Sequence, residues 1–252
     1  MLQFPPAKIN LGLRILRKRP DGYHDLETCF YPLPHFCDAL EMLVSERNSL
    51  QVHRADWQAS PEKNLVWRAM ELFRDTEKNL PPLKWNLLKC IPSGAGLGGG
   101  SSDAAYALLM MGRLCGWEAE DARLHDMAAR LGSDCAFFLL NKPAIGTGRG
   151  EILRPFPLDL SAWEIRLVLP PVHVSTSEAF SKVIPAEQQI PLEEILKLPV
   201  ESWKNLLVND FETSVFDKYP SLLEEKEKLY SEGAVYASLS GSGSALYGLF
   251  RK

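Results

Sequence analysis

Apolar and polar positions alternate along residues 8–16, near the start of the chain. The apolar members of this stretch are Ile9, Leu11, Leu13 and Ile15. A period of two predicts a β-strand with one face buried. Lys8 and Asn10 fall on the other face, beside each other along the strand, where we expect polar surroundings. Further strand patterns cover residues 27–33, 38–44, 49–53 and 82–91.

A helical spacing of apolar residues begins after residue 60. Ser60 is expected to cap this helix, with Pro61 at its first position. The stripe that would face the core is Leu65, Ala69, Leu72 and Phe73. A long helix is predicted after Ser102, and a second over residues 120–132 with Gly132 as its C-cap.

Prolines cluster near residue 155, where we place a domain boundary that divides the chain into residues 1–155 and 156–252. Beyond it, residues 164–170 are predicted to form a buried strand. Helices are expected near 176–183, 192–197, 201–208 and 219–232, and two strands joined by a small-residue loop over 234–250. Strands and helices do not alternate regularly, so the pattern indicates the α+β class.

Composition and charge narrow the class of protein. The chain of 252 residues is 46% hydrophobic and 24% charged, as is ordinary for a folded globular protein. A net charge of −4 argues against a nucleic-acid partner. No stretch approaches the roughly 18 apolar residues of a membrane span, so no membrane association is expected. Five irregularly spaced cysteines and the lack of a leader pattern predict a cytoplasmic protein without disulfides or a zinc site.

The segment 91–105, IPSGAGLGGGSSDAA, concentrates five glycines and three serines between residues 93 and 102. Each ordered glycine costs about 0.5–1 kcal/mol relative to alanine, so a compensating interaction is expected. A small-residue loop that leads from a strand into a helix offers backbone N–H groups and the positive end of the helix dipole to phosphate. The alternative interpretation is a flexible surface loop.

The same segment matches the dinucleotide fingerprint formally, as Gly94-x-Gly96-x-x-Gly99. That fingerprint follows the first strand of a βαβ unit and requires an acidic residue about 20 positions later, at the end of the second strand. Here the match lies in mid-chain, Pro92 interrupts the strand before it, and the nearby acidic residues fall in a loop or helix start. An NAD-dependent oxidoreductase is therefore the weaker hypothesis.

Three motifs, in order along the chain, resemble those of the GHMP kinases. They are Pro6–Leu11 (PAKINL), residues 92–105, and Leu239–Ser244 (LSGSGS), and together they span nearly the whole sequence. The resemblance implies a two-domain α+β fold. Its N-terminal, ATP-binding domain would be similar to domain 2 of ribosomal protein S5, and its C-terminal domain would be ferredoxin-like.

The resemblance also implies that ATP donates its γ-phosphoryl group to an alcohol. The residues that match the nucleotide-binding motif are Pro92, Ser93, Gly94, Ala95, Gly96, Leu97, Gly98, Gly99, Gly100, Ser101 and Ser102. Mg²⁺ is expected with ATP, and it often keeps several waters and few protein ligands. No carboxylate cluster for a metal is evident in the sequence, so no metal ligand is assigned.

Two residues match the catalytic pair of the family. Asp134 corresponds to the general base, and Lys8 to the lysine that keeps the aspartate ionised and polarises the alcohol. Taken alone, Asp134 is better explained as the N-cap of the next helix, and Lys8 could be a solvent-facing strand residue; the other motifs favour the catalytic roles. Whether Asp134 takes the proton or only orients the hydroxyl stays open. Cys135 and Ala136 replace the Val-Pro pair of many relatives, which affects local backbone stiffness.

The stretch Asp21–His24 (DGYH) narrows the resemblance to the branch of the family that acts on a small molecule, a cytidine-diphosphate derivative of methylerythritol. The resemblance implies that the 2-hydroxyl of this methylerythritol derivative is phosphorylated, as a step of the non-mevalonate route to isoprenoid precursors. The residues implied in binding this acceptor are Asn10, Tyr23, His24, Thr176, Phe180, Gly241 and Ser242. For Phe180, a core position at a helix start is the competing interpretation.

Three other hypotheses stay beside this one. A GHMP kinase of the homoserine or mevalonate type would lack the DGYH stretch at this place, and an NAD-dependent oxidoreductase would need a parallel sheet. A non-catalytic nucleotide-binding module would not need both Lys8 and Asp134. The sequence leaves open whether the protein is a monomer or a homodimer.

Overall fold

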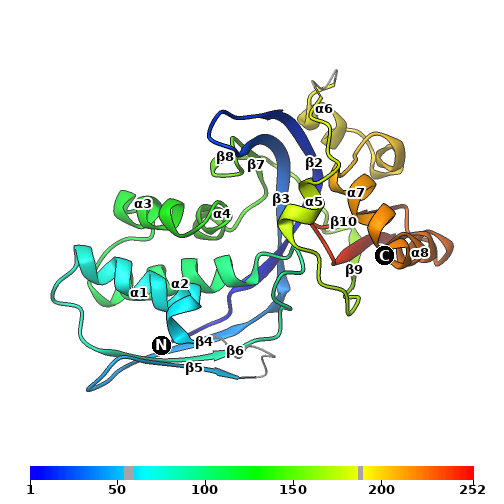
Figure 1. Ribbon diagram of the computed structural model, residues 1–252. Coiled ribbons are helices and arrows are strands. Elements are labelled where there is room, and N and C mark those ends of the chain that lie inside the picture. The colour runs from blue at the N-terminus through cyan, green and yellow to red at the C-terminus, as the bar shows by residue number, and fades with distance from the viewer. Residues whose placement is uncertain (54–59, 187–189) are drawn as a thin grey trace. The chain divides into compact units, whose positions relative to one another are not determined.

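The computed structural model describes residues 1–53, 60–186 and 190–252, and within them the chain forms two compact units (Figure 1). The first unit contains residues 1–8, 32–93 and 98–141, and the second contains residues 9–31, 94–97 and 142–252. These units do not follow a single cut at residue 155, because two N-terminal strands share a sheet with residues 144–155. Because each compact unit is built from separate stretches of the chain, the units do not test the domain boundary expected at residue 155, which stays a prediction.

A four-stranded sheet forms the base of the first unit. Its order is β1 (Leu2–Gln3), β4 (Ala39–Val44), β6 (Leu83–Leu88) and β5 (Ser49–His53). β4 runs antiparallel to β6, with Ala39 opposite Leu88, while β5 runs parallel to β6. Every second side chain of β6 is buried, which is the pattern that a sheet covered on one face requires.

Helices α1 (Leu65–Thr76), α2 (Gly99–Leu114), α3 (Ala122–Leu131) and α4 (Cys135–Leu140) complete the first unit. Figure 1 shows α1 and α2 along one face of the sheet, and α2 contacts α1, α3 and α4. Phe73, Trp85 and Leu108 are fully buried in the shared core. Each such side chain contributes about 1.5–3 kcal/mol by leaving water, so α2 is held firmly on three sides.

The second unit has two sheets. One has the order β2 (Pro6–Lys18), β3 (His24–Cys37), β7 (Ala144–Thr147) and β8 (Ile152–Pro155). Residues 6–8 of β2 and 32–37 of β3 belong to the first unit. The other is an antiparallel sheet of β10 (Tyr236–Leu239), β11 (Leu246–Arg251) and β9 (Trp163–Val168). The helices are α5 (Thr176–Phe180), α6 (Leu192–Leu196), α7 (Phe211–Lys218) and α8 (Pro220–Ser231), with a 3₁₀ turn at Val200–Asn205. Their core includes Val174, Phe211 and Leu239.

Several sequence predictions need correction. α2 begins at Gly99 rather than after Ser102, so part of the glycine-rich segment lies in its first turn. β9 exposes Glu164 and Arg166 and is not a fully buried strand, because only one of its faces is covered. α7 was not predicted, because its mixed sequence FETSVFDK has no clear apolar stripe. Gly132 is the C-cap of α3 as predicted, in an extended conformation.

The start of the first helical segment also differs from the prediction. Ser60 precedes a short 3₁₀ turn, Pro61–Lys63, and its side chain makes no capping hydrogen bond. The cap of α1 is Asn64, whose side-chain oxygen accepts a hydrogen bond of 2.9 Å from the N–H of Val66. A proline after a serine is thus an ambiguous signal, because it suits a 3₁₀ turn as well as an α-helix.

None of the helices among the described residues has the length and apolar character needed to cross a lipid bilayer.

Two variants test whether Asn64, and not Ser60, caps α1. Asn64→Ala should lower the free energy of unfolding by about 1 kcal/mol, because one N–H at the start of α1 loses its acceptor. Ser60→Ala is the matched control and should change it by no more than a few tenths of a kcal/mol. Urea denaturation measures both, and an equal loss in the two variants would contradict the assignment.

Candidate active site

Lys8 and Asp134 lie together in the first unit. The Lys8 Nζ is 3.4 Å from the Asp134 Oδ2, and the two side chains are 4% and 32% exposed. Every residue of β2 from Pro6 to Ile15 is buried, so the expectation that only one face of this strand is buried was wrong, as was the alternative of a solvent-facing Lys8. Neighbouring elements cover both faces of this strand, and Lys8 is therefore not an ordinary surface lysine.

The two charges of this pair sit in different surroundings. Burial lowers the pKa of Lys8, because its charged form loses water, while the charge of Asp134 and the hydrogen bond that Lys8 donates to it act in the opposite direction. Asp134 remains partly open to solvent. The arrangement places a dehydrated ammonium group beside an accessible carboxylate, which suits binding an anionic group and a hydroxyl together.

Asp134 stands at the N-cap position of α4, yet its side chain makes no capping hydrogen bond. The alternative interpretation of Asp134 as a helix cap is therefore wrong. The loop that carries it is anchored by Cys135, whose side chain is fully buried in the core of the first unit. The carboxylate is thus free of a capping role, while the residue that follows it is held in the core.

The first turn of α2 forms the second half of the glycine-rich segment. Gly98 is its N-cap with a left-handed φ of 72°, and the carbonyl of Gly98 accepts the first helical hydrogen bond from the N–H of Ser102. The N–H groups before Ser102 have no acceptor within the helix. The Ser102 hydroxyl is buried and has no hydrogen-bond partner among the described residues. Backbone donors, the helix dipole and a free hydroxyl fit a phosphate ligand.

Gly98 also lies directly against the Lys8–Asp134 pair. A Cβ on Gly98 would be 3.2 Å from the Lys8 Cε and 2.8 Å from the Phe138 Cζ, on α4. A side chain at position 98 would therefore displace Lys8 or the helix that follows Asp134. The first unit brings together the start of α2, Lys8 and Asp134, and their roles in the site stay a prediction.

The other half of the glycine-rich segment, residues 94–97, packs within the second unit against the C-terminal glycine loop. The Ser240 hydroxyl donates a hydrogen bond of 3.0 Å to the Gly96 carbonyl, and the Ala245 N–H donates one of 3.1 Å to the Ala95 carbonyl. Gly241 is buried against Gly96. Ser242 follows in the same loop and is half-buried. The two glycine motifs thus contact each other through one side-chain hydrogen bond and one backbone hydrogen bond.

His24 and Phe180, far apart in the sequence, come together in the second unit. Their rings stack with centroids 4.5 Å apart and planes 18° apart. Phe180 also contacts Phe211 edge to face at 4.8 Å, so the competing interpretation as a core residue is partly correct. Thr176 is exposed at the start of the same short helix, four positions earlier.

Tyr23 and Asn10 differ in accessibility. Tyr23 is 56% exposed, with the Arg149 guanidinium 4.9 Å from its ring centroid. Asn10 is buried, and its Nδ2 donates a hydrogen bond of 3.0 Å to the Thr28 Oγ1. Its carbonyl accepts another from the Tyr247 hydroxyl at 2.8 Å. Tyr23 is therefore available to a ligand, whereas Asn10 chiefly holds its strand in place.

Sequence reasoning did not single out two features near the glycine-rich segment. The His173 ring lies beside Gly94, where a Cβ would be 2.8 Å from its Cε1. Asp38, Lys89 and Asp103 form a buried cluster of charges in the first unit. The available signal was weak: each charge stands directly beside small or apolar residues, in CDAL, LKCI and DAAY.

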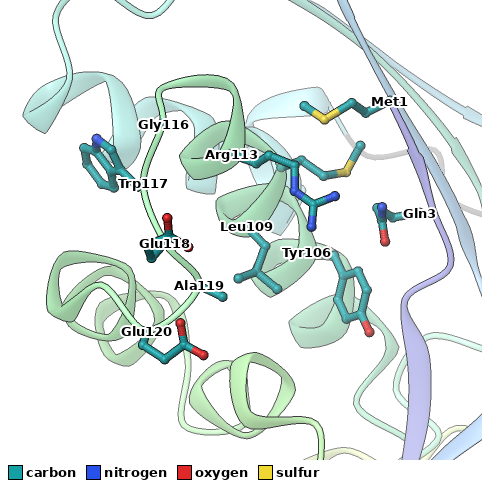
Figure 2. A pocket seen from close by; sticks show the side chains of 11 residues that line it. Met1, Gln3, Tyr106, Leu109, Arg113, Gly116, Trp117, Glu118, Ala119 and Glu120 are labelled. Carbon is teal, nitrogen blue, oxygen red and sulfur yellow. The ribbon is translucent and has the colours of Figure 1, made fainter.

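A cavity of about 520 Å³ lies elsewhere in the first unit, near the C-terminal half of α2 (Figure 2). Figure 2 shows Tyr106, Leu109 and Arg113 of α2 on one side and the loop of residues 116–120 on another. None of the predicted site residues lines it. The predicted site therefore lies at the opposite end of α2 from this cavity.

The part of the chain that the structure describes contains no group of three or more His, Cys, Asp and Glu side chains able to hold a metal ion.

Comparison with known proteins identifies the family. The model of the GHMP kinase N-terminal domain matches residues 64–142, and that of the C-terminal domain matches residues 189–252. The 4-diphosphocytidyl-2-C-methyl-D-erythritol kinase of Parabacteroides distasonis is 48% identical over 252 residues, which cover 100% of this chain and 92% of that protein. The chain belongs to the GHMP kinases.

Solved structures agree with this GHMP kinase assignment. A crystal structure of 4-(cytidine 5'-diphospho)-2C-methyl-D-erythritol kinase is 33% identical, has a TM-score of 0.83, and covers 99% of this chain and 90% of its own. A crystal structure of mevalonate kinase is 13% identical with a TM-score of 0.70, covering 100% of this chain and 91% of its own. That second likeness concerns the fold alone. The predicted two-domain α+β kinase fold is confirmed, and the dinucleotide-binding oxidoreductase hypothesis was wrong.

The packing of the glycine-rich segment predicts opposite effects at two glycines. In Gly96→Ala, the new Cβ would lie 1.9 Å from the Ser240 carbonyl oxygen at a φ of 78°, so we expect a loss of about 3 kcal/mol or more in the free energy of unfolding. In Gly100→Ala, the nearest atom is 3.6 Å away and the residue is helical, so stability should stay level or rise by up to about 1 kcal/mol. Urea denaturation measures the free energy of unfolding of both variants, and equal losses of stability would contradict this packing.

Lys8→Met should separate activity from stability. Removing the ammonium should lower kcat by about 100-fold or more. Stability at neutral pH should not fall, because burial already disfavours the charged Lys8. Since the unfolded chain holds this proton more tightly, the stability of the wild type relative to Lys8→Met should rise as pH is raised toward 10.5.

The matched control for Lys8→Met is Lys84→Met, which alters an exposed lysine on β6 of the same unit. Lys84→Met should keep kcat within about twofold. If Lys8→Met also kept its activity, the role of Lys8 in the site would be excluded.

Proposed function

We propose that this GHMP kinase transfers the γ-phosphoryl group of ATP to the 2-hydroxyl of 4-diphosphocytidyl-2-C-methyl-D-erythritol, a step of the non-mevalonate route to isoprenoid precursors. The observation that carries the proposal is the Lys8–Asp134 pair, 3.4 Å apart, against the start of α2. The acceptor is assigned from the named relatives, which cover the chain over its full length. The DGYH stretch at Asp21–His24 supports the same choice.

Phosphoryl transfer depends mainly on positioning and on neutralising charge. In this proposal the phosphates of ATP lie along residues 92–102, where the first N–H groups of α2 donate hydrogen bonds to them. Asp134 accepts the proton of the acceptor hydroxyl, whose oxygen forms the new bond to the γ-phosphorus as the bond to ADP breaks. Lys8 holds Asp134 ionised and offsets charge that develops on the transferring group.

Mg²⁺ accompanies ATP and neutralises charge on its phosphates. The Ser102 hydroxyl suits this ion, because it is buried at the start of α2 without a hydrogen-bond partner among the described residues. With few protein ligands, the ion would keep much of its water shell.

The cytidine of the acceptor is assigned to the aromatic residues of the second unit. Stacking of a base on an aromatic side chain contributes about 1–3 kcal/mol. His24 and Phe180 already stack on each other, so a cytosine would use the outer face of this pair or displace one ring. Tyr23 offers an exposed ring, and Arg149 above it offers positive charge to the diphosphate. Thr176, Asn10, Gly241 and Ser242 complete the proposed acceptor set.

The alternative acceptors are homoserine and mevalonate. Neither has an aromatic base, so the paired rings of His24 and Phe180 would have no counterpart in these substrates. A non-catalytic nucleotide-binding module would leave the Lys8–Asp134 pair without use. We place the protein in the cytoplasm as a monomer or a homodimer, with neither nucleic acid nor membrane as a partner.

An ADP-release assay with Mg-ATP tests the proposal. The acceptors are 4-diphosphocytidyl-2-C-methyl-D-erythritol, homoserine and mevalonate, each with wild type and Asp134→Asn. We expect turnover with the cytidine compound alone, and a loss of about 10²–10⁴-fold in the variant, which cannot accept the proton. Asp126→Asn, which changes an exposed carboxylate on α3, is the charge-matched control and should keep full activity.

Turnover with homoserine or mevalonate would keep the phosphate site and overturn the acceptor assignment. Nucleotide binding without turnover on any acceptor would favour the binding module. Full activity of Asp134→Asn would exclude Asp134 as the base.

A further inference from the structure

Three charged side chains meet inside the first unit, and the proposed chemistry uses none of them. Asp38 lies between β3 and β4, Lys89 follows β6, and Asp103 lies in α2. Their side chains are 0%, 11% and 3% exposed. The Lys89 Nζ donates hydrogen bonds to the Asp103 Oδ2 at 2.8 Å and to the Asp38 Oδ2. We refer to Asp38, Lys89 and Asp103 as the charged triplet.

The charged triplet contacts the chain on both sides of the glycine-rich segment. Before the segment, the Asp38 Oδ1 accepts hydrogen bonds from the backbone N–H groups of Cys90 at 2.5 Å and Ile91 at 2.8 Å. After it, Asp103 lies in α2, one turn beyond Gly99. A Cβ on Gly99 would be 3.2 Å from the Lys89 Nζ and 2.8 Å from the Ile91 Cγ2. Lys89 therefore bridges the residues that enter the segment and the helix that leaves it.

Stability alone does not explain these charges. A buried ion pair is often no more stabilising than apolar side chains of the same size, because both charges lose water. The Asp103 Oδ1 is buried without a partner among the described residues, which adds a further cost. Burial also raises the pKa of Asp103 to about 7, with Asp38 adding to the effect and Lys89 opposing it. The sequence keeps an arrangement that costs free energy beside the proposed phosphate site.

Directionality distinguishes this arrangement from apolar packing. Hydrogen bonds from Lys89 to two carboxylates, and from two backbone N–H groups to Asp38, set distances and angles between three separate segments. Apolar side chains would hold the same segments together without setting their relative rotation. Phosphate binding needs this precision, since the N–H donors of α2 must point at the ligand.

We propose that Lys89 and Asp103, held by Asp38, are positioning residues that keep the glycine-rich segment and the start of α2 in the conformation that binds ATP. The inference rests on the proposed function and assigns these residues no contact with substrate. They act through the backbone of residues 90–103. Loss of the charged triplet should therefore weaken ATP binding and leave the chemical step intact once ATP is bound.

Asp103→Asn is the central variant, because it keeps the shape of the side chain and removes its charge. Lys89→Met is the second, since it removes the ammonium from the other side of the pair. The control is Leu108→Ala in the same helix, where a fully buried apolar side chain is truncated away from the charged triplet. The control loses stability without touching the segment that the triplet holds.

Three measurements are compared across these proteins. Amide hydrogen exchange of residues 90–101 without nucleotide reports the order of the segment. Calorimetry with Mg²⁺ and a non-hydrolysable ATP analogue reports nucleotide binding. Steady-state kinetics report KM for ATP, KM for the acceptor, and kcat.

In Asp103→Asn and Lys89→Met we expect faster exchange in residues 90–101 and a KM for ATP raised about tenfold, a change equivalent to 1.4 kcal/mol. Their kcat and acceptor KM should stay within about threefold of wild type. Leu108→Ala should lower the melting temperature while keeping the KM for ATP within about twofold of wild type. A purely structural role would not raise the KM for ATP while leaving kcat and the acceptor KM nearly unchanged.

Two results would overturn the inference. The first is amide exchange and analogue affinity equal to wild type in both charge variants. The second is a loss of ATP affinity in Leu108→Ala as large as in the charge variants, in proportion to the fall in melting temperature. An inactive acceptor would count against the proposed function only, because exchange and analogue binding need no acceptor. Failure of the wild type to bind the analogue would overturn the proposed function, and the assignment of the triplet to ATP with it.

Discussion

The backbone at Gly98 is the constraint on which the candidate active site depends. Its left-handed φ of 72° turns the chain into α2, and the space where a side chain would stand is filled by Lys8 and Phe138. Only glycine meets both conditions without strain. Because of this contact, the free N–H groups at the start of α2 lie beside the Lys8–Asp134 pair, and a phosphate held by the helix comes within reach of both charges.

Charged groups in the first unit are buried at a cost in free energy that the apolar core offsets. Lys8 is almost fully dehydrated, and Asp38, Lys89 and Asp103 lie inside the same unit. Helices α1 to α4 and the sheet beneath them enclose a large core that supplies the compensating free energy. The buried charges thus have fixed neighbours, which suits a reaction that depends on positioning reacting groups more than on covalent catalysis by the protein.

Much of the fold was predictable from local patterns. The period of two over β2, the motif that leads into α2, and the exact match of β5 to residues 49–53 are encoded within a few neighbouring residues. Predictions that depended on distant contacts were less accurate. Only one face of β2 was expected to be buried, but both faces are covered from Pro6 to Ile15. Ser60 has the chemistry of a cap, yet Asn64 caps α1.

The sequence by itself determined the family, the position of the glycine-rich segment and the candidate pair Lys8 and Asp134, because motifs are short and contiguous. Only the tertiary structure decided that Asp134 faces Lys8 instead of capping α4, that His24 stacks on Phe180, and that Asp38, Lys89 and Asp103 share one buried cluster. These contacts join residues from 14 to 156 positions apart. Burial and charge pairing across such separations arise from packing, which no local pattern in the chain records.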